Sequence, residues 1–299
     1  MGILAPMIFA SLSVIVGLKA GLFNIGVSGQ MLASGFLATS LIGYSELEAC
    51  IAKPLVILIG IFVGGLLGMM VGFLKYKFNI NEVVSTIMLN YIISFITGFF
   101  INTYYADSIT RTSKIISAAS CLTIKNIEVY GCKLNIPIGI FIALAAVFVT
   151  RFLLDRTVFG FELKAVGSNR YCAKYAGMNV GRNMVLTMAL SGTLAGLAGV
   201  TYYLGYYNTI VPKSLANLGY DAIAVALLGN TSPVGSIFAS VLITIFQKGS
   251  IYMNSIIGVP KEISSLIVGI LLLFSACSGY FQYKVHRNYM KKTGKEGSR

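Results

Sequence analysis

The sequence predicts an all-α membrane protein that crosses a bilayer about eight times and carries one additional re-entrant half-helix. Hydrophobic residues make up 56% of its 299 residues, charged residues make up only 11%, and the mean hydropathy is +0.81. A soluble chain of this length could not bury so much apolar surface. Apolar stretches of about 20 residues, long enough to cross the hydrocarbon core, also recur along the chain.

The predicted spans follow one another through short connections. The first span has no basic segment before it, so it is not a cleavable signal peptide. The spans are Gly2–Leu18, Leu22–Tyr44, Pro54–Leu74, Val83–Tyr105, Leu134–Leu154, Met184–Leu204, Val234–Met253 and Ile263–Tyr283. We expect them to form a single transmembrane domain over residues 1–283, followed by a basic tail over 284–299.

The segment Gly219–Asn230 is apolar for only about ten residues before Asn230–Pro233 stops it, too short to cross a core of roughly 30 Å. We therefore interpret it as a re-entrant half-helix. Asp221 at its start is consistent with an acid at a helix N-terminus, or with an acceptor for a polar solute.

Lysine and arginine concentrate in three regions of the chain: residues 75–77, residues 151–182 and the tail after 284. The positive-inside rule places these three regions, and therefore the C-terminus, in the cytoplasm. This bias accounts for the formal net charge of +13 without a nucleic-acid partner, because no nucleic-acid-binding motif accompanies the charges. It also places Met1 outside the cell.

Two predicted spans carry polar residues at helical spacing. Thr86, Asn90, Ser94 and Thr97 share one helix face, and a second face carries Ser232, Ser236, Ser240, Thr244 and Lys248. Such faces avoid lipid, so they either line a solute pathway or form hydrogen bonds between helices, worth on average under about 1 kcal/mol each.

The stretch GLFNIGVSGQ, residues 21–30, interrupts an apolar run with amides and glycines. Irregular backbone at membrane depth is tolerated only where it lines a cavity or is buried in protein. The amides of this stretch could therefore meet a solute or neighbouring helices. The candidate solute-pathway residues are Asn24, Gln30, Thr86, Asn90, Ser94, Asp221, Asn230, Ser236 and Ser240.

Glycines form two close-packing faces. The first face consists of four glycines at four-residue spacing, Gly60, Gly64, Gly68 and Gly72. The second, shorter face consists of Gly192, Gly196 and Gly199. Because glycine lets two helix backbones approach closely, both faces predict helix–helix packing.

The chain lacks the usual parts of an enzyme. Its one histidine, His286, lies in the basic tail, and it contains neither a nucleotide-binding P-loop nor a CxxC pair. We therefore predict no catalytic residues, no metal and no cofactor. Cys121 and Cys132 share one predicted outer loop and could form a disulfide, but two free thiols are the favoured alternative.

The loop over residues 155–183 contains a short predicted helix, Arg170–Ala176, between the sequences SN and GMN. It could dock a cytoplasmic partner, or lie on anionic membrane lipid.

Four stretches together resemble the permease subunits of binding-protein-dependent ABC importers of the ribose, branched-chain amino acid and nucleoside type. They are KAGLFNIGVSGQ (Lys19–Gln30), NEVVSTIMLNYI (Asn81–Ile92), AVGSNRYCAKYAGMNV (Ala165–Val180) with LSGTLAGLAGV (Leu190–Val200), and GYDAIAVALLGNTSPVG (Gly219–Gly235). The first, second and fourth resemble the nucleoside branch, whose solute receptors are basic membrane lipoproteins.

The resemblance implies a multi-pass protein of the bacterial cell membrane that forms the pathway for a small polar solute, a nucleoside or alternatively a simple sugar. The implied partners are cytoplasmic ABC ATPase subunits, a second permease subunit, an extracytoplasmic solute-binding lipoprotein and membrane lipid. The implied ATPase-coupling residues are Gly167, Asn169, Arg170, Ala173 and Gly177.

Two departures from the family pattern accompany this resemblance. Ser28 stands where members usually carry glutamate, and members usually begin with one more transmembrane helix, whose absence here would explain Met1 lying outside. An ion-coupled secondary transporter remains the alternative from another class, since it too would show broken helices and polar faces. It would need a buried acid or histidine on a span, for which Asp221 is the candidate.

Overall fold

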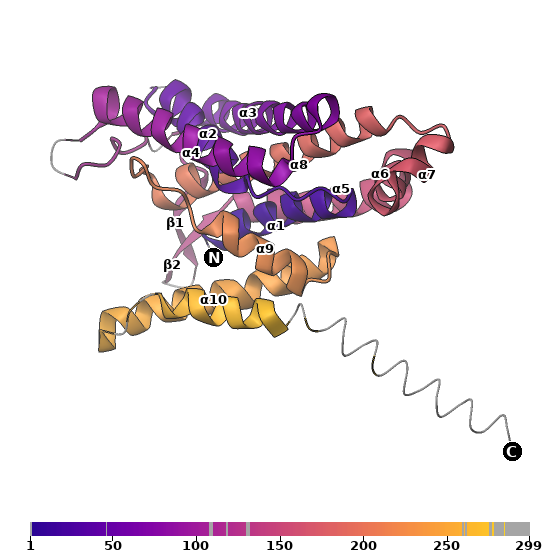
Figure 1. The fold of residues 1–299 in the computed structure, drawn as a ribbon. Helices are drawn as coiled ribbons and strands as arrows, with labels where there is room; N and C mark the ends of the chain where they lie inside the picture. Colours follow the sequence, from indigo (N-terminus) through magenta and orange to yellow (C-terminus); the bar gives the residue numbers. More distant parts are fainter. Residues whose placement is uncertain are drawn as a thin grey trace, which may run out of the picture. The chain divides into compact units, whose positions relative to one another are not determined.

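A computed structural model describes residues 2–45, 47–107, 110–117, 119–129, 132–258, 260, 262–274, 277 and 284. The chain forms two compact units, Met1–Thr244 and Ile245–Arg299. The elements of the first unit run from α1 to the first half of α10, and Figure 1 shows their order. The second unit contains the rest of α10 and a helix over Ile263–Phe274. The basic tail, with His286, lies outside the described residues apart from position 284.

The helices are α1 (Leu4–Lys19), α2 (Val27–Ala38), α3 (Ala49–Phe78), α4 (Glu82–Phe100), α5 (Gly139–Arg156), α6 (Val158–Ser168), α7 (Arg170–Tyr175), α8 (Val180–Tyr202), α9 (Leu218–Leu228) and α10 (Pro233–Ile257). Short π-helical turns extend three of them: η1 (Thr39–Gly43) after α2, η2 (Ile101–Tyr105) after α4 and η3 (Tyr203–Tyr207) after α8.

The predicted helical class is confirmed, with one correction in the connection between α4 and α5. The strands β1 (Thr123–Val129) and β2 (Cys132–Pro137) form an antiparallel hairpin there. The expectation of a helix beginning at Leu134 is therefore wrong, and α5 begins at Gly139. Pro137 disfavours helical backbone in the residue before it, and the strand pairing with β1 satisfies the backbone groups of this stretch.

The close packing predicted at the glycine faces is confirmed, and the structure shows that the faces of α3 and α8 pack against each other. A Cβ added to Gly64 would collide with the carbonyl oxygen of Gly192, and one added to Gly68 would collide with that of Met188. A Cβ on Gly199 would meet the backbone of Met31 on α2. α8 therefore lies against both α3 and α2 at backbone distance, and its middle is buried among the helices of the first unit.

Four helices in the described part of the chain are long and apolar enough to cross a membrane. They are Ala49–Phe78, Glu82–Tyr105, Val180–Tyr207 and Pro233–Ile257. Shorter apolar helices cover Leu4–Lys19, Val27–Gly43, Leu218–Leu228 and Ile263–Phe274. The chain thus has the helices of a multi-pass membrane protein, while the number of crossings stays a prediction.

Candidate functional site

The stretch between α1 and α2 is not helical. Residues 20–26, here called the broken segment, leave α1 through a turn at Gly21, whose φ of +65° favours glycine, and continue to Gly26 without regular secondary structure. The predicted interruption in GLFNIGVSGQ is therefore confirmed, and the helix expected from Leu22 begins only at Val27.

Asn24 connects the broken segment to three helices. Its Nδ2 donates to Gln30 Oε1 (3.0 Å) on α2 and to Ser191 Oγ (2.9 Å) on α8, while its Oδ1 accepts from the Gly26 N–H (2.9 Å). Ser191 Oγ in turn donates to the carbonyl of Ser13 (2.7 Å) on α1. All these side chains are buried. The sequence pointed to Asn24 and Gln30 but missed Ser13 and Ser191, because single serines in apolar runs carry no periodic signal.

Asn90 on α4 supports the same segment from the other side. Its Oδ1 accepts from the Gly29 N–H (2.9 Å) and its Nδ2 donates to the Ile25 carbonyl (3.0 Å). These two bonds satisfy backbone groups where the helical ladder is interrupted. The other members of its helix face, Thr86, Ser94 and Thr97, are also buried, so the predicted inward orientation of this face is confirmed.

The polar face of α10 is buried at its centre. Ser236, Ser240 and Thr244 are at most 8% exposed, whereas Ser232 is exposed. Five buried side-chain atoms of the first unit have no hydrogen-bond partner among the described residues: Gln30 Nε2, Ser34 Oγ, Thr39 Oγ1, Ser240 Oγ and Thr244 Oγ1. Buried polar groups of this kind are usually satisfied, so these five atoms have hydrogen-bonding capacity that the described residues do not use.

The half-helix prediction corresponds to α9, which follows a non-helical loop and places Asp221 in its first turn. Ser28 Oγ on α2 donates to the Ala216 carbonyl (2.9 Å) just before α9, and a Cβ on Gly219 would lie 2.7 Å from the Ser28 nitrogen. A glutamate at position 28 would have to displace this contact. Asn230 lies in the turn after α9 with a left-handed φ of +52° and is exposed.

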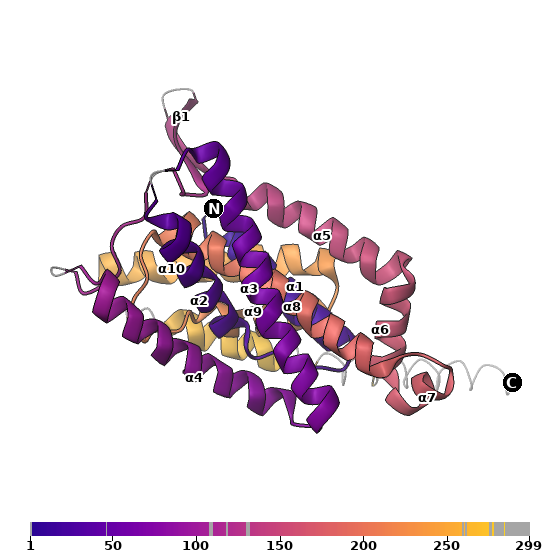
Figure 2. The ribbon, with the colours of Figure 1, turned by 90° about the horizontal axis from the view of Figure 1, so that it is seen from above.

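The helices α6 and α7 form an arm at the opposite end of the first unit from the β1–β2 hairpin (Figures 1 and 2). Asn169 caps α7, because its Oδ1 accepts from the N–H groups of Tyr171 (3.0 Å) and Cys172 (3.1 Å). Gly177 ends α7 with a φ of +82°, and Ala173 is buried. The predicted short helix is therefore confirmed, and we call α6 and α7 the arm.

The outward side of the arm is aromatic and basic. Tyr171 is 78% exposed and Tyr175 is 94% exposed, and Lys174 between them is also exposed. At the base of the arm the Lys164 ammonium lies 2.7 Å from Asp155 and holds the pKa of that carboxyl below its ordinary value. This pair is solvent-exposed and contributes little to stability.

The two basic regions predicted to share one side of the membrane lie at the same end of the first unit. Tyr76, near the end of α3, packs over Gly181 at the start of α8, so the lysines of residues 75–77 lie close to the arm. Figure 2 shows the end of α3, the start of α4 and the arm at one end. The third basic region, the tail, lies almost wholly outside the described residues.

The described residues contain no group of three or more His, Cys, Asp or Glu side chains that could hold a metal ion. Cys121 is a free thiol whose Sγ donates to Asn208 Oδ1 (3.4 Å), in agreement with the favoured alternative of two thiols. The side chain of Cys132 lies outside the described part.

Comparison with known proteins identifies relatives over nearly the whole chain. The nucleoside ABC transporter permease NupB of Lactococcus lactis is 35% identical over 281 residues, which cover 91% of this chain and 77% of that protein. The guanosine ABC transporter permease NupP of Bacillus subtilis is 36% identical over 295 residues, covering 97% and 83%. The glucose ABC transporter permease TsgB13 of Haloferax volcanii is 27% identical over 288 residues, covering 94% and 76%.

No solved structure matches the chain significantly. Residues 1–276 match the family described as branched-chain amino acid transport system / permease component. This match covers the broken segment, the arm and the polar faces of α4 and α10. The chain therefore belongs to this family of transporter permease components, which are not themselves enzymes.

Proposed function

We propose that this chain is the transmembrane permease subunit of an ABC importer and that its solute is a nucleoside. The observation that carries the proposal is its 35–36% identity, over more than nine-tenths of its length, to two permeases named for nucleoside and guanosine transport. A simple sugar is the second candidate solute, supported by the more distant glucose permease. Family membership favours an ATP-driven importer over the ion-coupled transporter.

In this proposal the chain lies in the bacterial cell membrane with about eight crossings, and α9 is the re-entrant half-helix. The end that carries the arm and residues 75–77 faces the cytoplasm, as does the C-terminus. The clustering of both basic regions at this end supports the orientation. A second permease subunit completes the pathway, a solute-binding lipoprotein delivers solute at the outer end, and two ATPase subunits act at the inner end.

The solute pathway is proposed to run along the buried polar side chains of the first unit. The unused hydrogen-bonding atoms of Gln30 and Ser240 support it, because an uncharged solute rich in hydroxyl and amide groups would satisfy them. Asn24, Thr86 and Asn90 are already bonded within the protein, so they serve the pathway chiefly by holding its wall. The proposed residues remain Asn24, Gln30, Thr86, Asn90, Ser94, Asp221, Asn230, Ser236 and Ser240.

Solute identity is tested by uptake in a strain that lacks the gene. We expect uptake of labelled guanosine or uridine to fall to the background level and to return when the gene is supplied on a plasmid. Uptake of labelled ribose and glucose in the same cells is the control and should not change. Normal nucleoside uptake, together with lost sugar uptake, would show that the solute is a sugar and not a nucleoside.

Docking of the ATPase subunits is proposed at the exposed tyrosines of the arm, Tyr171 and Tyr175. The coupling residues Gly167, Asn169, Arg170, Ala173 and Gly177 hold the arm in place and do not supply its contact surface. Tyr175→Ala should reduce copurification of the ATPase subunits with the tagged permease, because a side chain that is 94% exposed contributes to binding and hardly to the fold. A loss of about 2 kcal/mol, typical of an interface tyrosine, corresponds to roughly 30-fold weaker binding.

Tyr104→Ala is the matched control for this experiment. Tyr104 is 65% exposed in η2, at the other end of the first unit, so its removal should leave copurification unchanged. Equal copurification of the wild-type and Tyr175→Ala proteins would place the ATPase contact elsewhere than on α7.

A further inference from the structure

The arm is attached directly to the broken segment. Gly167 near the end of α6 packs on the backbone of α1's last turn: a Cβ there would collide with the Lys19 carbonyl oxygen and lie 2.8 Å from the Ala20 carbonyl carbon. From the other side, a Cβ on Gly21 would lie 3.1 Å from the Gly167 carbonyl oxygen. The arm and the start of the broken segment therefore touch backbone to backbone, with no side chain between them.

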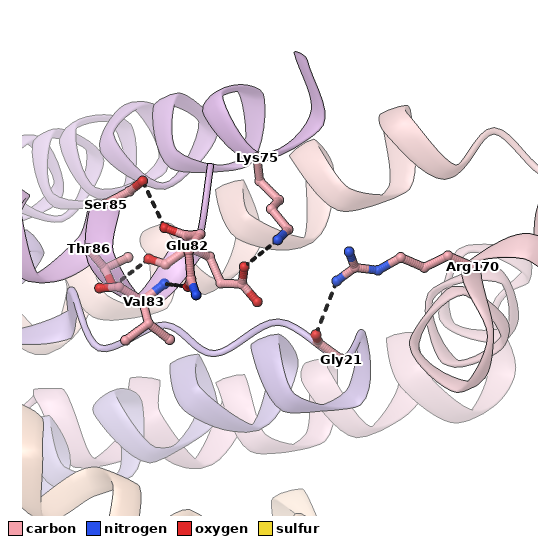
Figure 3. Close-up of polar contacts among 8 residues, drawn as sticks. Gly21, Lys75, Glu82, Val83, Ser85, Thr86 and Arg170 are labelled. Atoms are coloured by element: carbon pink, nitrogen blue, oxygen red, sulfur yellow. Dashed lines mark hydrogen bonds and ion pairs between the residues drawn. The ribbon is translucent and has the colours of Figure 1, made fainter. Parts of the chain in front are cut away.

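Charged groups reinforce this contact (Figure 3). Arg170, the first residue of α7, donates from Nη2 to the Gly21 carbonyl at 3.5 Å. Lys75 on α3 forms an ion pair with Glu82 on α4 at 2.8 Å, and both side chains are only 13% exposed. We call Gly21, Gly167 and Arg170 the joint, and the Lys75–Glu82 pair fixes α3 and α4 beside it.

From the joint, a continuous set of contacts leads into the polar core. Gly21 is three residues before Asn24, whose side chain bonds to α2 and α8. The carbonyl of Ile25 accepts from Asn90, which carries the contact to α4. Backbone without a helical hydrogen-bond ladder can change its φ and ψ angles more easily than a helix can, and the broken segment is the part of this connection that lacks such a ladder.

We propose that the broken segment transmits movement of the arm to the buried polar core, with the joint as its point of attachment. The inference rests on the proposed function, because it takes the arm to be where the ATPase subunits act. Displacement of α7 would pull Gly21 through the backbone contact with Gly167 and the Arg170 bond. Asn24 and Ile25 would then shift against α8 and α4. Gly21, Gly167 and Arg170 are thus positioning residues that couple ATP hydrolysis to opening of the pathway.

The test uses the complete complex of permease, ATPase subunits and binding protein, purified and reconstituted in liposomes. Gly167→Ala must open the joint, because the atoms that its Cβ would meet are backbone. We expect the amount of nucleoside transported per ATP hydrolysed to fall by about tenfold, a coupling loss of ordinary size. The ATPase subunits should remain bound and hydrolysis should continue. Gly249→Ala is the control: like Gly167 it lies within a helix, but nothing lies within 4 Å of its added Cβ.

A second pair of variants leaves the backbone untouched and decides the matter if Gly167→Ala fails to insert. Arg170→Ala should lower the same ratio, and Arg170→Lys should restore most of it because a charged donor to the Gly21 carbonyl is kept. A wild-type ratio in both Gly167→Ala and Arg170→Ala would overturn the proposal, and so would loss of the ATPase subunits from these variants. If the wild-type permease itself failed to copurify with ATPase subunits, the proposed function would be at fault instead.

Discussion

Gly64→Ala combined with Gly68→Ala should abolish the folded permease or lower its free energy of unfolding by about 3 kcal/mol or more, since overpacking of this kind cannot relax. Both added methyl groups would meet backbone carbonyl oxygens of α8, those of Gly192 and Met188. Backbone cannot rotate away as a side chain can, so α3 and α8 would have to separate along their contact. Thermal unfolding and monodispersity of the detergent-purified protein measure the effect.

Gly65→Ala is the matched control, because Gly65 is also buried and lies between the two glycines tested. Its added Cβ would come closest to a side-chain methyl of Thr193, at 2.8 Å, and otherwise meets only the Ala189 carbonyl oxygen, at 3.8 Å. A rotation of Thr193 relieves that contact, and alanine favours the helix. An unfolding temperature as low for Gly65→Ala as for the double variant would show that the close approach of the two helices is not what the glycines provide.

Asn90→Ala should lower the free energy of unfolding by about 2–6 kcal/mol, because each of two buried backbone groups loses its partner at a cost of about 1–3 kcal/mol. The groups are the Gly29 N–H and the Ile25 carbonyl. Thr97→Val is the matched control on the same buried face, since the Thr97 hydroxyl donates only to the carbonyls of Ile93 and Ser94 in its own helix. Thermal unfolding of the two purified variants makes the comparison.

The same variant separates a structural role for Asn90 from direct contact with solute. If Asn90 holds the wall of the pathway, Asn90→Ala should lower stability and maximal transport rate together. A raised KM for nucleoside, with an unchanged unfolding temperature, would instead place Asn90 in contact with the solute. The bonds seen at both ends of its amide favour the first outcome.

Much of this architecture was predictable from the sequence. Hydropathy located the helices, and the helical period of Thr86, Asn90, Ser94 and Thr97 identified the buried face of α4. Residues 21–30 showed where a helix must be interrupted, because glycines and amides there oppose an apolar helix. The glycine repeats of α3 and α8 predicted close packing, although spacing alone could not show that these two faces meet each other.

Other features depended on contacts between residues far apart in the chain. Hydropathy counts apolar residues and contains no information on backbone pairing. It therefore placed the start of a helix at Leu134, where the structure has a strand. Gly167 and Asn169 were both expected to couple the permease to the ATPase subunits, but their structural roles differ. Gly167 packs on α1, whereas Asn169 caps α7.

Sequence by itself determined the class of protein, its helices and the position of the interruption, because these depend on local composition and periodicity. Only the tertiary structure decided what Asn24 and Asn90 bond to, and that the arm rests on Gly21. An amide in an apolar segment must find a partner, but which partner depends on the helices that packing brings beside it.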